Sequence, residues 1–284
     1  MSMITTHQNN GQITVLLAAR SINPLSRLFQ RELAALLDQL ESRRAKLDAV
    51  IISFDADTVD RSHELEHLMA LTRAQAPDCM HMLDAYNTLL RRLEGLGVPV
   101  IATLAGEISS HAFGLALACH RRIALQDACF SLPQVSLGLA PVAGEIARTV
   151  RLAGLQAAMP LLLDGATLSA AQALHAGLVH AVAGDETELA QNAMDKAIAM
   201  QPWEAKAYRL PGGGLDAAPV RALLLSAPAL LRQRAGGPSP AAEAVLCAMV
   251  EGMQVDFENA LQIESRYFCQ TAINPAQRKG SLSL

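Results

Sequence analysis

Residues 98–145 constrain the fold of this chain more than any other stretch. They begin with an apolar run of strand length and pass through Ala105-Gly106 into the turn Ser109-Ser110-His111. A short apolar run of helical character follows and ends near His120. The first N–H groups of a helix have no partner within the helix and carry partial positive charge. Strand, turn and helix N-terminus together predict a backbone site for an anion or a developing oxyanion.

The same stretch resembles the crotonase family of enoyl-CoA hydratases and isomerases. The family signature reads P-x-I-A-x-x-x-G, a three-glycine turn, a helix that ends in A-x-A-C, and then R-I-A, L-P-E, L-G and P-G-x-G-G. The matching residues are Pro99, Ile101, Ala102, Gly106, Leu117, Ala118, Cys119, Arg122, Ile123, Ala124, Leu132, Pro133, Leu137, Gly138, Leu139, Pro141 and Gly144. The family pattern A-L-x-x-G-L-V also recurs at residues 173–179.

This resemblance implies an α/β fold in which ββα-like units form a spiral core. It places the crotonase core at residues 1–201, followed at 202–284 by a linker and a C-terminal helical region for oligomerisation. The end of the chain looks most like the hydratase part of multifunctional fatty-acid oxidation proteins, whose NAD-binding fingerprint is missing here. The family assembles as trimers or hexamers. A homotrimer or hexamer is therefore expected, with a separate dehydrogenase as a possible partner.

The resemblance also implies an oxyanion hole of two backbone N–H groups for the thioester carbonyl of an acyl-CoA. The second donor maps to His111, in Ser110-His111-Ala112 at the place of the three-glycine turn. The first maps to Thr58, in a loop where Ala56 is the matching substrate-binding position. A backbone N–H survives any substitution except proline, but a positive φ in this turn would cost energy without glycine.

Both glutamates that the family uses for hydration are replaced. Gly114 stands at the first position and Gln134 at the second, so both positions are expected to line the substrate site without exchanging protons. Loss of a positioned acid or base removes about 10²- to 10⁴-fold in rate. The sequence therefore predicts weak or absent hydratase activity, with isomerase-like or other enolate chemistry. The alternative is a catalytically silent homologue that binds acyl-CoA or serves as a scaffold subunit.

Two residues are candidates for a replacement catalytic group. Glu145 stands where the family has the second glycine of P-G-x-G-G, and it either acts as the carboxylate or pairs with Arg148 or Arg151 on a helix surface. His111 offers an imidazole as well as its N–H, and it either titrates in the site or fills the space of the lost glycines. His120, at the helix end, is expected to be structural because a helix C-terminus favours a cation.

Coenzyme A is expected only as part of the substrate, with no other cofactor. By position in the family, Arg20, Phe268 and Lys279 are candidates to contact it, and solvated surface charge is the alternative for the two basic residues. A metal is not predicted, because His63 and His67 share a helical face without a third ligand at a recognisable spacing. The five cysteines are expected to be buried free thiols.

Composition excludes several classes of protein. The net charge of −4 offers no footprint for nucleic acid or an anionic membrane surface, and 51% hydrophobic residues with 18% charged residues exclude general disorder. No apolar run approaches the roughly 20 residues that span a bilayer, and the N-terminus lacks the pattern of a signal peptide. A cytoplasmic protein is therefore expected.

Hydrophobic periodicity locates the regular elements. Strands are predicted at residues 12–19, 48–54, 98–104 and 178–182, the first two as a parallel pair around a helix. That helix is capped by Ser26, and its buried face comprises Leu25, Leu28, Phe29, Leu33, Leu36, Leu37 and Leu40. Further helices are predicted at residues 153–163, 168–177, 186–200, 219–234 and 241–271.

Overall fold

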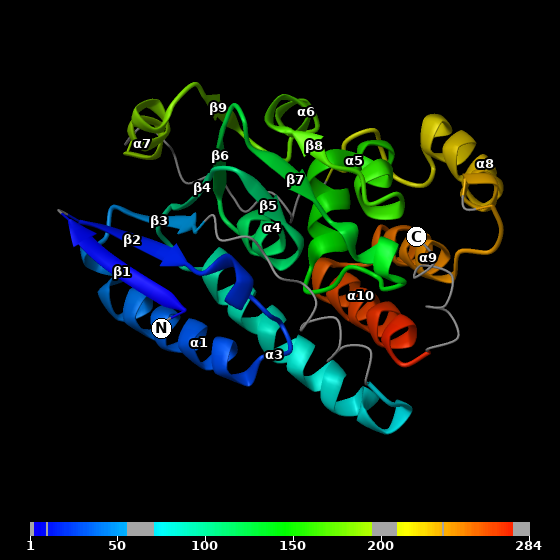
Figure 1. The fold of residues 1–284 in the computed structure, drawn as a ribbon, viewed down its shortest axis with the longest axis horizontal. Coiled ribbons are helices and arrows are strands. Elements are labelled where there is room, and N and C mark those ends of the chain that lie inside the picture. The colour runs from blue at the N-terminus through cyan, green and yellow to red at the C-terminus, as the bar shows by residue number, and fades with distance from the viewer. Residues whose placement is uncertain (1–2, 10, 56–70, 195–208, 235, 275–284) are drawn as a thin grey trace. The chain divides into compact units, whose positions relative to one another are not determined.

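The computed structural model describes residues 3–9, 11–55, 71–194, 209–234 and 236–274. They group into two compact units, each assembled from separate stretches of the chain (Figure 1). We call them the sheet unit, from Met1–Asp60, Ala85–Phe130 and Leu168–Glu204, and the helical unit, from Arg61–Asp84, Ser131–Thr167 and Ala205–Leu284. The division into a core at residues 1–201 and a helical region at 202–284 stays a prediction.

The sheet unit contains a six-stranded sheet in the order β1-β2-β3-β4-β6-β9. Its strands are β1 (Ile4–Asn9), β2 (Gln12–Leu17), β3 (Ala49–Phe54), β4 (Val100–Leu104), β6 (Arg121–Leu125) and β9 (Ala181–Ala183). All neighbours pair in parallel except β1 and β2, so the predicted parallel pair is confirmed. A second sheet has the order β5-β7-β8, from β5 (Glu107–Ser109), β7 (Cys129–Ser131) and β8 (Leu168–Ser169).

Strand β1 was not predicted, because its sequence ITTHQN has no apolar alternation. Its hydrogen bonds to β2 determine it instead, with Ile4 opposite Leu17 and Asn9 opposite Gln12. An edge strand needs only one partner and no buried face, so tertiary pairing can impose it on a polar sequence.

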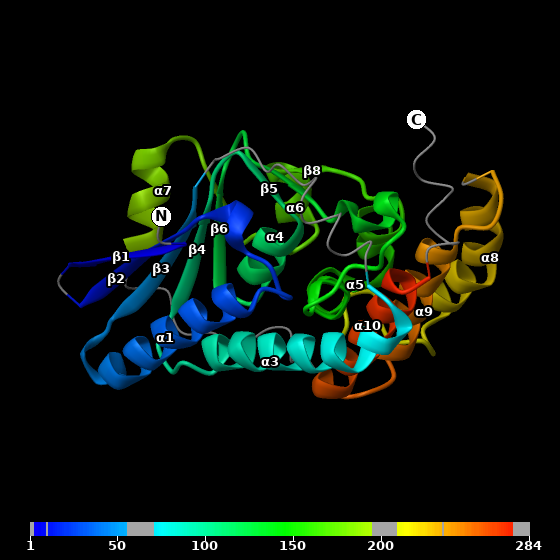
Figure 2. The ribbon, with the colours of Figure 1, turned by 60° about the horizontal axis from the view of Figure 1, so that its bottom comes forward.

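Helices cover both faces of the large sheet (Figure 2). Helix α1 (Arg27–Arg43) and the second half of α3 (Ala76–Glu94) lie along one face, where the rings of Phe29 and Tyr86 have centroids 6.3 Å apart. Ser26 caps α1 as predicted, accepting the N–H of Phe29. The predicted burial of Leu28 is wrong. Leu28 is exposed, because it lies about 100° around the helix from Phe29.

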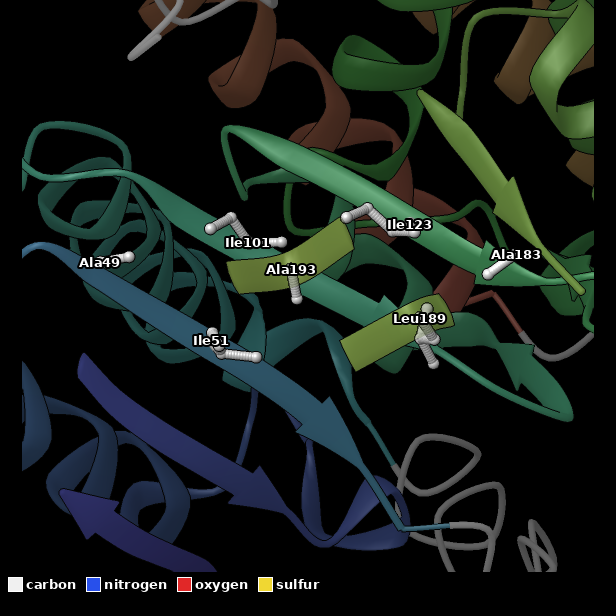
Figure 3. Packing of buried hydrophobic residues seen from close by; sticks show 7 residues of the cluster. All are labelled: Ala49, Ile51, Ile101, Ile123, Ala183, Leu189 and Ala193. Carbon is white, nitrogen blue, oxygen red and sulfur yellow. The ribbon is translucent and has the colours of Figure 1, made fainter. Parts of the chain in front are cut away.

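Helix α7 (Glu186–Met194) covers the opposite face (Figure 3). Its Leu189 and Ala193 pack on a row of small and branched side chains from four strands, namely Ala49, Ile51, Ile101, Ile123 and Ala183. The shorter helices of this unit are α4 (Ser110–Leu117) and α6 (Ala170–His175). Ser169 stands in a capping box at the start of α6, and Gly177 has a positive φ after its end.

The helical unit packs α5 (Glu145–Leu163), α9 (Pro240–Gly252) and α10 (Phe257–Ala272) together, with α8 (Ala218–Arg234) against α5. The prediction of a single helix at residues 241–271 is wrong. The chain turns before Asp256, whose carboxylate caps α10. Helix α5 also starts eight residues earlier than predicted. It bends at Gly154 (φ 80°), where an added Cβ would meet the Pro211 carbonyl oxygen at 2.1 Å.

Four short 3₁₀ helices complete the described chain, at Ala19–Ser21, Arg44–Lys46, Arg73–Gln75 and Pro133–Leu137. Helix α5 has the length and hydropathy of a membrane span, but 61% of that stretch is buried inside the structure. Its first turns also contain Glu145 and Arg148. We therefore interpret α5 as a core helix of its unit.

Candidate active site

The predicted oxyanion turn opens α4 in the sheet unit. Gly106 (φ 68°) precedes β5, and Ser110 (φ 53°) follows it as the first residue of the helix. A left-handed conformation costs a residue with a Cβ roughly 1–2 kcal/mol. Ser110 thus keeps the conformation typical of a glycine turn without glycine, which is the cost that the sequence predicted.

His111 is the second residue of α4 and is buried. Its N–H belongs to the first turn of the helix, and its role as an oxyanion donor stays a prediction. Gly114 is buried in the middle of the same helix and contributes no side chain. Thr58 and Ala56, predicted for the other half of the oxyanion hole, lie outside the described residues.

Two buried side chains hold the far end of α4. His120 Nδ1 accepts the N–H of Val100 at 3.0 Å, so its Nε2 carries the proton and donates to the Glu94 carbonyl at 3.0 Å. His120 is therefore structural as predicted, but as a neutral ring. The cation at this helix end is Arg122, whose guanidinium donates to the carbonyls of Cys119 at 2.7 Å and Leu178 at 2.6 Å.

In the helical unit, the structure brings Gln134 and Glu145 together. Gln134 Nε2 donates to Glu145 Oε2 at 2.6 Å, and the N–H of Val142 donates to the same oxygen at 3.2 Å. Glu145 is the first residue of α5 and is 0% exposed. The Gln134 amide thus holds a carboxylate eleven residues further along the chain. The surface placement of Glu145 considered from the sequence is wrong, since Arg148 is fully buried as well.

A second buried carboxylate, Glu264 from α10, binds the same turn. Its oxygens accept the N–H groups of Gly144 at 2.9 Å and Ala147 at 3.0 Å. Burial raises the pKa of Glu264 to about 8, an effect that the Ala147 N–H and Arg148 oppose and the Glu145 charge reinforces. Two turns of α10 further along, Thr271 Oγ1 accepts the N–H of Ala140 at 3.1 Å. Helix α10 therefore holds residues 140–147 by three backbone N–H groups.

Arg148 supports this turn from inside the helix. Its Nη1 donates to the Ala143 carbonyl at 3.0 Å, and its guanidinium stacks 5.3 Å from the Phe257 ring centre. Ala143 (φ 65°) and Gly144 (φ 83°) are both left-handed. A Cβ on Gly144 would lie 1.6 Å from Arg148 Nη1, so only glycine leaves room for the buried guanidinium.

The sequence patterns did not predict a role for Glu264 or Thr271. They share the buried face of α10 with Phe257, Leu261 and Phe268, at three- and four-residue spacings. A carboxylate on an apolar helical stripe is the signal that would have found Glu264, because buried charge needs compensating partners.

Two of the remaining predicted contacts lie in the described part of the chain. Arg20 is exposed in the turn after β2, and Phe268 is buried within α10. Lys279, His63 and His67 lie outside the described residues. Within the described part of the chain, no group of three or more His, Cys, Asp or Glu side chains could hold a metal ion. The CoA contacts stay predictions.

A cavity of about 380 Å³ opens elsewhere in the sheet unit. Hydroxyl groups of β2, β3 and β4 line one wall (Thr14, Ser53 and Thr103), and Leu189 and Met194 of α7 form the other. None of the described candidate residues borders it.

Comparison with known proteins agrees with this architecture. The family model described as enoyl-CoA hydratase/isomerase matches residues 7–209. Among solved structures, an enoyl-CoA hydratase from Bacillus halodurans is 19% identical, with a TM-score of 0.62 and 100% of both chains covered. A carnitinyl-CoA dehydratase from Mycobacterium thermoresistibile is 15% identical, with a TM-score of 0.72, covering 99% of this chain and 88% of that one.

A third structure, an enoyl-CoA hydratase/carnitine racemase from Magnetospirillum magneticum, is 24% identical over 69% of this chain and 73% of its own, with a TM-score of 0.59. At such identities, likeness to a solved structure establishes the fold alone. The predicted α/β crotonase-like fold is confirmed.

Proposed function

The chain belongs to the enoyl-CoA hydratase/isomerase family, and we propose that it binds an acyl-CoA thioester and stabilises the enolate formed from it. The reaction is isomerase-like or other enolate chemistry, with weak or absent hydration. The thioester oxygen accepts the backbone N–H groups of Thr58 and His111. Glu145 or His111 moves the proton, and the variants below distinguish the two.

The hydrogen bond between Gln134 and Glu145 carries this proposal. Isomerisation of an enoyl-CoA needs one group that takes a proton from one carbon and returns it to another. Hydration needs a second group, which activates water. An amide at residue 134 cannot serve as that second group, but it orients the one carboxylate that lies beside it, at 2.6 Å.

The first experiment compares two substrates in the ultraviolet. Hydration of crotonyl-CoA removes the absorbance of the conjugated thioester, whereas isomerisation of a 3-enoyl-CoA creates it. We expect conversion of the 3-enoyl-CoA and little or no loss with crotonyl-CoA. Crotonyl-CoA hydration at a rate equal to the isomerisation would contradict the proposal.

Two variants then assign the chemistry. Glu145→Gln should lower the isomerisation rate by about 10²- to 10⁴-fold, because it removes the proton-transfer group and keeps the side chain's size. Glu243→Gln is the matched control, since that carboxylate pairs with Arg232 on an exposed face of α9. His111→Ala keeps the backbone donor and removes the imidazole. If His111→Ala greatly lowers the isomerisation rate and Glu145→Gln leaves it unchanged, His111 is the acid–base group.

One observation favours a second candidate function. Glu145 is fully buried and accepts two hydrogen bonds on one oxygen, which also suits a carboxylate that only stabilises its turn. The chain would then be a silent homologue that binds acyl-CoA or serves as a scaffold subunit. Acyl-CoA binding by calorimetry without turnover of either substrate would support it, and failure to bind would leave the scaffold role.

We also propose self-association through α8 as a homotrimer or hexamer. Leu225 and Leu230 are 87% and 40% exposed on this helix, an unusual placement for large apolar side chains. Sedimentation should give a trimer or larger species, and Leu225→Glu should shift it towards monomer. A dehydrogenase partner, a cytoplasmic location, a role in fatty-acid metabolism and the absence of other cofactors stay predictions.

A further inference from the structure

Two buried thiols meet in the helical unit, between the first half of α3 and α10. Cys269 Sγ lies 3.3 Å from Cys79 Sγ, and the two residues are 5% and 4% exposed. Both cysteines are free. A second contact joins the same helices, because Gln262 Nε2 donates to Asp84 Oδ1 at 2.6 Å. The two contacts run in opposite chain directions along the pair, so the helices lie antiparallel and present the thiols to each other.

We propose that Cys79 and Cys269 form an oxidation site, which a peroxide converts into a disulfide between α3 and α10 and a dithiol restores. A disulfide bond is about 2 Å long, so the sulfur atoms need to approach by only about 1 Å. The link would join positions 190 residues apart. It would also involve the helix that holds residues 140–147, because Cys269 lies between Glu264 and Thr271.

The geometry assigns a different role to each sulfur. The Cys269 thiol donates to Cys79, which lowers the pKa of Cys79 and raises that of Cys269. The Cys79 thiolate is therefore the nucleophile towards the peroxide. Its sulfur bonds to one peroxide oxygen while the O–O bond breaks, which gives a sulfenic acid at Cys79 and, after protonation of the departing hydroxide, one water.

Cys269 then resolves the sulfenic acid. Its sulfur attacks the Cys79 sulfur, the S–S bond forms, and the S–O bond breaks. The departing hydroxide takes the Cys269 proton and becomes a second water. Two thiols are thus oxidised by two electrons, and one peroxide is reduced to two waters.

The test uses the full-length protein with Cys247→Ser, because the exposed Cys247 thiol would otherwise join separate molecules. The protein is treated with a stoichiometric amount of hydrogen peroxide, alkylated in denaturant and digested without reduction. Mass spectrometry should find a peptide pair linked through Cys79 and Cys269, with two fewer alkylated thiols. Dithiothreitol should restore both, and the yield should not depend on protein concentration.

Cys119→Ser is the matched control, because that thiol is also buried and contacts the Leu115 carbonyl rather than a second sulfur. The link should persist in Cys119→Ser and vanish in Cys79→Ser and Cys269→Ser. The measurement on the parent protein does not depend on whether these variants fold. Oxidation of the less buried Cys129 shows that the peroxide has reacted with the protein. If Cys79 and Cys269 are still fully alkylated at that point, the proposal is overturned. A disulfide from either of them to any other cysteine would also overturn it.

Discussion

The turns that open α4 and α5 share one backbone feature, a residue with a Cβ at positive φ, but differ in what surrounds them. Each contains a non-glycine residue at positive φ, Ser110 at 53° and Ala143 at 65°. The α4 turn leads into a short helix of buried apolar residues. The α5 turn leads into buried ionisable side chains, with Glu145, Arg148 and Glu264 all at most 1% exposed.

This difference explains which substitutions each turn tolerates. The α4 turn is proposed to act through a backbone N–H, which serine, histidine and alanine supply as well as glycine does. The α5 turn depends on particular side chains, because a buried carboxylate or guanidinium is stable only with its partners in place. The α5 turn therefore depends on a specific polar cluster, whereas the role proposed for the α4 turn needs only backbone atoms.

The largest expected effect is the pH dependence that Glu264 gives to stability. Its pKa is about 8 in the folded protein and near 4.5 in the unfolded chain. Below pH 4.5 both states are protonated. As the pH rises to about 8, the unfolded chain releases the proton and the folded protein retains it, so stability is lost across this window. At about 1.4 kcal/mol per pKa unit, the loss approaches 5 kcal/mol.

Glu264→Gln provides the measurement. The amide does not titrate, so only the parent loses stability through this residue as the pH rises. The unfolding free energy of the variant minus that of the parent should therefore increase from pH 4.5 to pH 8 and then level off. Urea unfolding at several pH values in this range would show it. A difference that stays constant with pH would mean that Glu264 is ionised in the folded protein and that its N–H partners outweigh burial.

Gly144→Ala should cost about 3–5 kcal/mol of unfolding free energy. The new Cβ would displace a buried guanidinium from its hydrogen bond to Ala143, in addition to the strain of the positive φ. Gly97→Ala is the matched control, since Gly97 has the same φ of 83° and open space around it. Strain alone should cost the control about 1–2 kcal/mol. Equal costs in the two variants would show that Arg148 moves aside freely.

Ser110→Gly should stabilise the protein by about 0.5–1 kcal/mol, the smallest of these effects. The free energy gained by removing the left-handed strain is larger than the free energy lost through the greater conformational entropy of glycine in the unfolded chain. Ser109→Gly is the control, because Ser109 is extended at φ −134° and should only lose stability. A shift in melting temperature measures both. Destabilisation by Ser110→Gly would indicate that the serine side chain supports the turn.

Short-range patterns predicted most of the regular elements. The β2-α1-β3 unit, the Ser26 cap and the end of α6 follow from periodicity and capping residues, which act within a few residues of each other. The polar strand β1 and the break before Asp256 did not follow in this way. The first depends on pairing with β2, and the second on how α9 and α10 pack.

The sequence by itself predicted the crotonase-like fold and singled out Gly114, Gln134 and Glu145 as candidate site positions. Only the tertiary structure decided that Gln134 binds Glu145, that Glu264 and Thr271 hold the same turn from α10, and that Cys79 meets Cys269. The physical reason is distance along the chain. Glu264 lies 120 residues from Gly144, and no local periodicity relates a buried carboxylate to a partner that far away.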